Sequence, residues 1–207
     1  MSLLAALDYA SVFVFALTGA LVASRAQLDL VGFVFIASLT AVGGGTLRDV
    51  ILNRDTVFWV ANPAFIGVAA TAAIIVFFTA HLLESRYRGI IWLDALALAV
   101  AVPSGVGVAL AMELPSSITV IMGITTGCFG GLMRDVVCNE VPLILHKGEL
   151  YVTCALVGAI AALTALALGS STAIALVLCA IATFALRTGS IALGWRLPVY
   201  KSFPPRK

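Results

Sequence analysis

Seven apolar runs, each close to the length of a membrane-crossing helix, divide the chain and leave little sequence between them. A helix needs about 20 apolar residues to cross about 30 Å of hydrocarbon. Hydrophobic residues make up 62% of the chain and charged residues 11%, which is far from the balance of a water-soluble domain. We therefore expect an all-α membrane protein with seven transmembrane helices, near residues 3–24, 30–53, 63–83, 90–111, 116–138, 149–168 and 172–193.

Lysine and arginine residues near the helix ends predict the orientation, because cytoplasmic loops retain these residues. One side of the predicted bundle carries only Arg48 and Arg54, whereas the other carries Arg25, Arg86, Arg88, Lys147, Arg196, Lys201, Arg206 and Lys207. This asymmetry places the N-terminus outside and the C-terminus in the cytoplasm, in the inner (plasma) membrane of a prokaryotic cell. The basic tail is expected beside anionic lipid headgroups.

A repeat without gaps relates the two halves of the chain. Residues 44–50 read GGTLRDV and residues 130–136 read GGLMRDV, a shift of 86 residues that also places Asp8 on Asp94. Because this shift spans three crossings, the second copy must be inverted relative to the first. The predicted units are a first three-helix repeat (1–85), a second, inverted three-helix repeat (86–170), and a seventh helix with the basic tail (171–207).

Glycine runs mark the second and fifth predicted helices at residues 43–45 and 130–131. Each glycine costs a helix about 1 kcal/mol relative to alanine, so we expect a bend or an opening. Opened backbone inside a membrane must face protein or a water-filled cavity, which favours a pathway along these helices. The alternative is close helix packing through small residues. The predicted pathway residues are Gly43, Gly44, Gly45, Thr40, Ser104, Thr126, Gly130 and Gly131. The alternative role of the Thr40, Ser104 and Thr126 hydroxyls is to satisfy backbone carbonyls of their own helices.

An Arg-Asp dipeptide follows each glycine run. The charged motif residues, with their partners on neighbouring helices, are Arg48, Asp49, Arg134, Asp135, Asp8 and Asp94. An unpaired charge inside a membrane is costly, so we expect Asp8 to pair with Arg48 and Asp94 with Arg134. Adjacent side chains on a helix diverge, so neither arginine needs to pair with the aspartate that follows it. The ion pairs either lock helices together or contact ions. Arg187 has no repeat mate and is expected in the bundle interior or reaching towards the cytoplasm.

Several function classes are excluded. The chain has no glycine-rich phosphate loop, zinc-protease motif or nucleophile elbow, so we expect neither an enzyme nor a cofactor. Its four cysteines lack metal-ligand spacing and are expected to be buried thiols, with no metal bound beyond transient monovalent cations. A net charge of +2 without a basic, aromatic-lined stripe excludes nucleic acid as a partner.

Two copies of a Gly-Gly-x-x-Arg-Asp motif, at residues 44–49 and 130–135, resemble the prokaryotic branch of the trimeric intracellular cation (TRIC) channels. The resemblance covers nearly the whole chain and implies a homotrimer in which each protomer holds its own pore between the repeats. The implied permeant ions are monovalent cations, K⁺ or Na⁺ and chiefly K⁺, and the glycines would bend the helices beside the pore. Phe129, where the second copy lacks a third glycine, would be a constriction or a packing residue. Relatives of this domain have also been labelled glycine transporters, so the alternative is a secondary transporter of a small amino acid with a midplane site.

Overall fold

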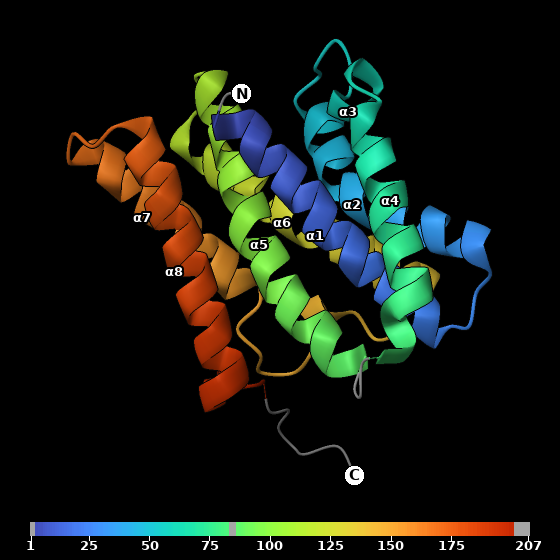
Figure 1. The fold of residues 1–207 in the computed structure, drawn as a ribbon. Helices are drawn as coiled ribbons and strands as arrows, with labels where there is room; N and C mark the ends of the chain where they lie inside the picture. The colour runs from blue at the N-terminus through green and yellow to red at the C-terminus, as the bar shows by residue number, and fades with distance from the viewer. Residues whose placement is uncertain (1–2, 83–85, 201–207) are drawn as a thin grey trace.

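The computed structural model describes residues 3–82 and 86–200 of the chain (Figure 1). The predicted boundary at residue 85 and the basic tail from Lys201 onwards lie outside the described residues. The described elements are α1 (Leu3–Arg25), α2 (Leu30–Ile51), α3 (Phe58–Ala61), α4 (Ala64–Thr79), the 3-10 turn η1 (Ala80–Leu82), α5 (Arg86–Ala111), α6 (Ser116–Val137), the 3-10 turn η2 (Leu143–Leu145), α7 (Val152–Ala167) and α8 (Thr172–Leu193).

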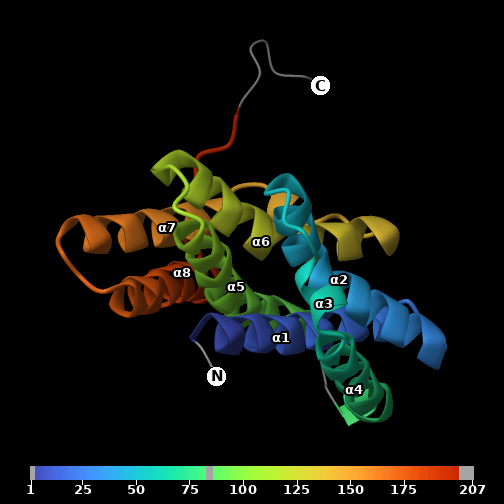
Figure 2. The same ribbon diagram turned by 90° about the horizontal axis from the view of Figure 1, so that it is seen from above.

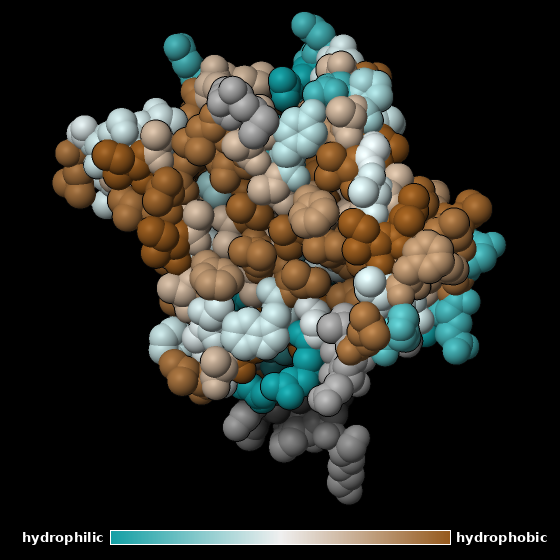
Figure 3. Space-filling view, viewed as in Figure 1, coloured by the Kyte–Doolittle hydropathy of each residue, from teal (hydrophilic) through white to brown (hydrophobic). Residues whose placement is uncertain are grey.

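The long helices confirm an all-helical membrane protein. Six described helices are long and apolar enough to cross a membrane, with α4 counted together with η1 as Ala64–Leu82, whereas α7 has 16 residues and is shorter. The sequence placed the start of α5 at residue 90, but the helix begins at Arg86. It also missed α3 and η2, which are only 4 and 3 residues long and therefore leave no periodic pattern. Figure 3 shows hydrophobic residues across the middle of the molecule and hydrophilic residues towards its upper and lower edges.

Local sequence sets where the helices begin and end. The Asp29 carboxylate caps α2 by accepting a hydrogen bond of 2.7 Å from the amide of Gly32, and the Ser171 hydroxyl caps α8 at Ile174. Asn53 and Asn139 adopt left-handed backbone angles, with φ of 48° and 55°, just beyond α2 and α6. Asparagine tolerates this conformation better than most residues, so the two helices end in the same way.

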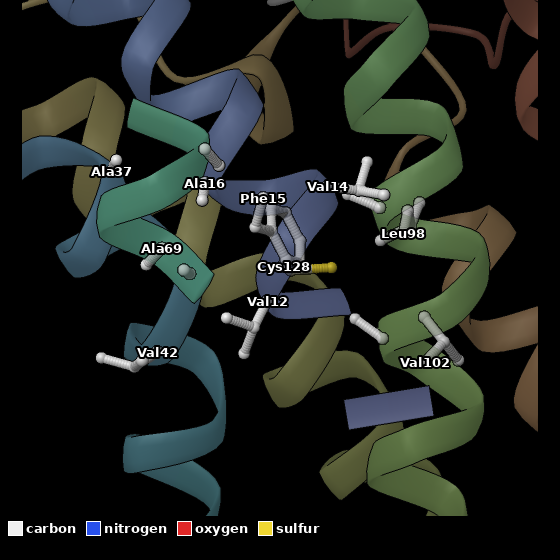
Figure 4. Close-up of a cluster of buried hydrophobic side chains, with 14 of the residues drawn as sticks. Val12, Val14, Phe15, Ala16, Ala37, Val42, Ala69, Leu98, Val102 and Cys128 are labelled. Atoms are coloured by element: carbon white, nitrogen blue, oxygen red, sulfur yellow. The ribbon is translucent and has the colours of Figure 1, made fainter. Parts of the chain in front are cut away.

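The helices pack around α1 and α5, which lie side by side at the centre (Figures 1 and 2). In Figure 1, α1 begins at the top and runs down, α5 runs up, and α8 ends at the bottom. Buried side chains from all seven long helices, α1, α2 and α4 to α8, form one cluster, part of which is drawn in Figure 4. Many of these side chains are alanines, among them the fully buried Ala16, Ala20 and Ala23 of α1. Small residues allow helix backbones to approach closely, which is the main source of packing energy within a membrane.

Candidate functional site

Arg48 of α2 is fully buried and sits in a cluster of polar groups from three helices. Its Nε donates a hydrogen bond of 2.8 Å to Oδ1 of Asp49, and its Nη1 lies 3.6 Å from Oδ1 of Asp8 in α1. The same Nη1 donates to the Ser104 hydroxyl of α5 at 3.2 Å, and that hydroxyl donates to Asp8. The predicted pair of Asp8 and Arg48 is therefore present, together with a hydroxyl from the other half of the chain.

Arg134 of α6 sits in a matching cluster. Its Nη1 lies 3.3 Å from Oδ1 of Asp94 in α5, which confirms the second predicted ion pair. The same nitrogen donates a hydrogen bond of 2.8 Å to the hydroxyl of Thr18 in α1. Thr18 and Ser104 are 86 residues apart, so they are repeat mates. Each arginine therefore takes a carboxylate from the first helix of its own repeat and a hydroxyl from the first helix of the other.

Each arginine also pairs with the aspartate that follows it, a contact that the divergence of adjacent helical side chains does not require. Arg134 Nε donates to Asp135 Oδ1 at 2.7 Å, matching the contact between Arg48 and Asp49. The arginine side chain is long enough to fold back along the helix, so diverging Cβ atoms do not prevent the contact. The second oxygen of each aspartate accepts an amide at 2.9 Å, from Phe58 or Leu143. Both aspartates thus fix the segment that follows their helix.

The glycine runs are the place where α2 and α6 touch. A Cβ atom on Gly44 would collide with the main-chain carbonyl oxygen of Thr126, and a Cβ on Gly130 would collide with that of Thr40. Both helices remain α-helical through their glycines, so the opened backbone that we expected does not occur in this structure. The Thr40 and Thr126 hydroxyls donate to carbonyls one turn back, at 2.6 and 2.7 Å. The glycines allow close approach between helices, which is the packing alternative.

A cavity of about 10 Å³ lies at this contact, beside the Arg48 cluster. It has room for about one water molecule. Within the described residues, Nη2 of Arg48 has no hydrogen-bond partner. Both halves of the chain line the cavity, including Asp8, Ser11, Thr40, Gly44, Arg48 and Thr126. Of the other predicted pathway residues, Gly45 lines it too and Ser104 bonds to two of its lining residues, whereas Gly43, Phe129, Gly130 and Gly131 do not line it.

Beside the Arg134 cluster lies Arg187, which the sequence predicts in the bundle interior, together with two residues that the sequence did not single out, Tyr151 and Glu149. Arg187 of α8 is fully buried, in the bundle interior, with its guanidinium 4.9 Å from the centre of the Tyr151 ring. Its Nη1 donates to Glu149 at 3.0 Å. Burial raises the pKa of Tyr151, and the nearby Asp94 carboxylate raises it further, so the phenol keeps its proton. Phe65 is the repeat mate of Tyr151, so both repeats carry an aromatic ring at this position. That correspondence is the feature of the sequence that could have identified Tyr151.

The two ends of the molecule carry further ion pairs. Arg54 Nη1 lies 3.2 Å from Oδ1 of Asp49, and Arg54 lines an open hollow of about 520 Å³ together with Asn53 and Asp55. Arg25 Nη1 lies 3.2 Å from Oε2 of Glu140. No group of three or more histidine, cysteine or acidic residues able to hold a metal ion occurs in residues 3–82 and 86–200. The polar features of this region are ion pairs, hydroxyls and backbone contacts.

Comparison with known proteins identifies relatives across most of the chain. The family model described as "Glycine transporter" matches twice, at residues 5–81 and 91–167. The UPF0126 membrane protein of Vibrio cholerae is 37% identical over 204 residues, covering 96% of this chain and 83% of that protein. The UPF0126 inner membrane protein YadS of Escherichia coli strain K12 is 39% identical over 163 residues, 77% of each chain.

Solved structures agree with these matches. The TRIC trimeric intracellular cation channel orthologue from Rhodobacter sphaeroides has a TM-score of 0.90 and 40% identity, covering 94% of this chain and all of that one. A second TRIC cation channel structure has a TM-score of 0.85 and 28% identity, covering 97% of this chain and 98% of that one. The fold and its relatives define a multi-pass inner-membrane protein. The chain belongs to the TRIC channel family, in its prokaryotic branch.

Proposed function

We propose that this protein is a monovalent cation channel with one pore in each protomer. In this proposal α7 also spans the membrane, giving seven crossings, and the two repeats are inserted in opposite orientations. The antiparallel course of α1 and α5 and the exchanged hydroxyls of Ser104 and Thr18 support this arrangement. The pore runs between the repeats, along α2 and α6.

The observation that carries the proposal is a polar cavity buried at the contact of α2 and α6. The first repeat lines it with the Asp8 carboxylate, the Arg48 guanidinium and hydroxyl-bearing residues, and the second repeat lines it with Thr126 and Ala101. Ionisable side chains inside a membrane-spanning bundle are typical of an ion or substrate path. With room for about one water the path is closed in this conformation, so conduction requires α2 and α6 to separate around their glycines. In this proposal α2 and α6 bend at their glycines only in that open state.

Potassium is the main ion in this proposal, and sodium also permeates. The resemblance to TRIC channels implies this preference, whereas the site of this chain holds both acidic and basic groups, so its charges alone do not set it. The proposal also includes a homotrimer, since the solved relatives are described as trimeric intracellular cation channels. The N-terminus lies outside and the C-terminus in the cytoplasm, following the excess of basic residues on one side. The basic tail then meets anionic lipids.

Transport of a small amino acid is a second candidate, favoured by one specific contact. Arg48, with an unpartnered buried Nη2 within the described residues, lies beside the Asp8 carboxylate. A guanidinium and a carboxylate together match the two charges of a zwitterion such as glycine. The family model carries the same description. The cavity is too small for glycine in this conformation, so a transporter would need an additional open state.

Purified protein in a planar bilayer separates the two functions. A channel gives unitary currents in KCl, because a continuous wet path conducts many ions at each opening. A transporter gives saturable uptake of labelled glycine into proteoliposomes without unitary currents. Unitary potassium currents without glycine uptake support the proposal, and glycine uptake without such currents overturns it in favour of the second candidate. Absence of both activities would leave a structural membrane protein.

A further inference from the structure

The two repeats treat one pair of equivalent places differently. The open hollow of about 520 Å³ lies where α2 and α5 end, with Arg54 and Met112 in its lining. Their repeat mates, 86 residues away, are Glu140, which follows α6, and Ala26, which follows α1. Because α1 and α5 run in opposite directions (Figure 1), the equivalent place lies at the other end of the molecule, where α6 and α1 end.

An ion pair between the repeats joins the helix ends at that second place. Nη1 of Arg25, the last residue of α1, lies 3.2 Å from Oε2 of Glu140. The repeat mate of Arg25 is Ala111, which has no charge to pair with Arg54. Arg54 turns back to Asp49 of α2 instead, at 3.2 Å. The ion pair of Arg54 therefore stays within one repeat, whereas that of Glu140 connects the two.

The pair between the repeats is open to solvent and supported from one side. Its side chains are 34% and 29% exposed, so solvent screens the charges and the pair can part and re-form. The Arg25 guanidinium lies 5.2 Å from the centre of the Tyr87 ring in α5, a cation–π contact that holds it in place. Glu149, at the same end of the molecule, already pairs with Arg187 and His146. Glu140 is therefore the carboxylate that Arg25 contacts.

We propose that the ion pair of Arg25 with Glu140 is a latch that favours the closed state of the channel. Arg25 ends α1, which packs along α2, and Glu140 follows α6. Conduction in the proposed function requires α2 and α6 to separate, and that separation pulls the two side chains apart. The pair therefore parts when the channel opens, and the free energy of the contact is lost in the open state. This inference rests on the proposed channel function.

The test measures the open probability of single channels in symmetric 0.1 M KCl. Glu140→Gln and Arg25→Gln each remove the latch, so the open probability should rise about two- to fivefold, the range of a weak, partly exposed ion pair. A contact that only stabilises the fold would lower the melting temperature and leave the open probability unchanged. In 1 M KCl the screening length falls from about 10 Å to about 3 Å, so the difference between Glu140→Gln and the unaltered channel should shrink.

Exchange of the two charges shows whether the contact itself matters. Arg25→Glu alone, or Glu140→Arg alone, places like charges together and should open the channel at least as much as the glutamine variants. The double variant Arg25→Glu with Glu140→Arg restores an opposite-charge pair and should return the open probability towards that of the unaltered channel. Asp29→Asn is the matched control: it removes an exposed acid at the start of α2, at the same end of the molecule, while keeping an N-cap, and it should not change the open probability.

Two results would overturn the latch while leaving the channel function intact. One is an unchanged open probability in both glutamine variants. The other is a double variant that stays as open as the single charge reversals, because the effect would then come from local charge and not from the pair. Absence of cation current in the unaltered protein and in every variant would instead overturn the proposed function and this inference with it.

Discussion

Gly44 of α2 lies directly against the main-chain carbonyl of Thr126 in α6, and its repeat mate Gly130 lies in the same way against the carbonyl of Thr40. These reciprocal contacts join the two repeats at the polar cavity. Gly44 also lines the cavity, so this close contact between α2 and α6 lies where a pore between the repeats would have to open.

Alanine at either glycine should destabilise the protein. The new methyl group meets a helix backbone that cannot rotate away, so α2 and α6 must move apart. Overpacking of this kind costs about 1–3 kcal/mol, which thermal unfolding in detergent can measure for Gly44→Ala and Gly130→Ala. Gly67→Ala in α4 is the control, because a Cβ there has no atom within 4 Å. Equal stability of Gly44→Ala and Gly67→Ala would contradict the close contact.

The buried pair of Asp94 and Arg134 should show strong coupling in a double-mutant cycle. Both side chains are fully buried, so Arg134→Gln alone leaves an uncompensated carboxylate at a cost of about 3–5 kcal/mol. Asp94→Asn in the same chain should recover part of that loss.

The half-exposed pair of Arg25 and Glu140 provides the comparison. Its side chains are 34% and 29% exposed, and solvent screening limits such pairs to about 0–1 kcal/mol. Additive effects at Asp94 and Arg134, with coupling no larger than at Arg25 and Glu140, would refute the structural importance of the buried pair.

Cys138 should react slowly with maleimide at neutral pH. Burial raises the pKa of this thiol and the Glu140 carboxylate raises it further, so the reactive thiolate is scarce below the raised pKa. The labelling rate should rise about tenfold for each pH unit until the pH passes that value. Glu140→Gln removes one cause of the shift and should speed labelling at pH 7. A rate equal to that of a free cysteine, or one insensitive to Glu140→Gln, would disagree with this environment.

The same cysteine reports orientation. Cys138 follows α6 and is only partly buried, whereas Cys128, Cys154 and Cys179 are buried. A membrane-impermeant maleimide should therefore label the folded protein at Cys138, and only from the cytoplasmic side. Labelling of intact spheroplasts, which expose the outer surface, would reverse the proposed orientation.

The sequence was sufficient to predict the ion pairs that occur once in each repeat. Matching depths on neighbouring helices were enough to pair Asp8 with Arg48 and Asp94 with Arg134, because an uncompensated charge in a membrane is costly. The exchange of hydroxyls between repeats was not predicted. It depends on how α1 and α5 cross, and no local sequence pattern specifies a crossing between helices distant in the chain.

The glycines show a second limit of sequence reasoning. Helix propensity alone indicates that residues 43–45 weaken α2, but it cannot say whether a neighbouring helix fills the space. Here Thr126 does so, and α2 remains helical. Arg187 was likewise recognised as unusual, but its neighbours Tyr151 and Glu149 lie just before α7, where irregular backbone leaves no periodic pattern.

Cysteine accessibility in the conducting protein tests the central claim, a cation path between the repeats, most directly. Ser11 lines the cavity, whereas Phe13, two residues further along α1, is 41% exposed on the outer surface of the bundle. In a chain without other cysteines, a small water-soluble thiol reagent should reduce the potassium current of Ser11→Cys and leave that of Phe13→Cys unchanged. Full current in Ser11→Cys after modification proven by mass spectrometry would place the ion path elsewhere.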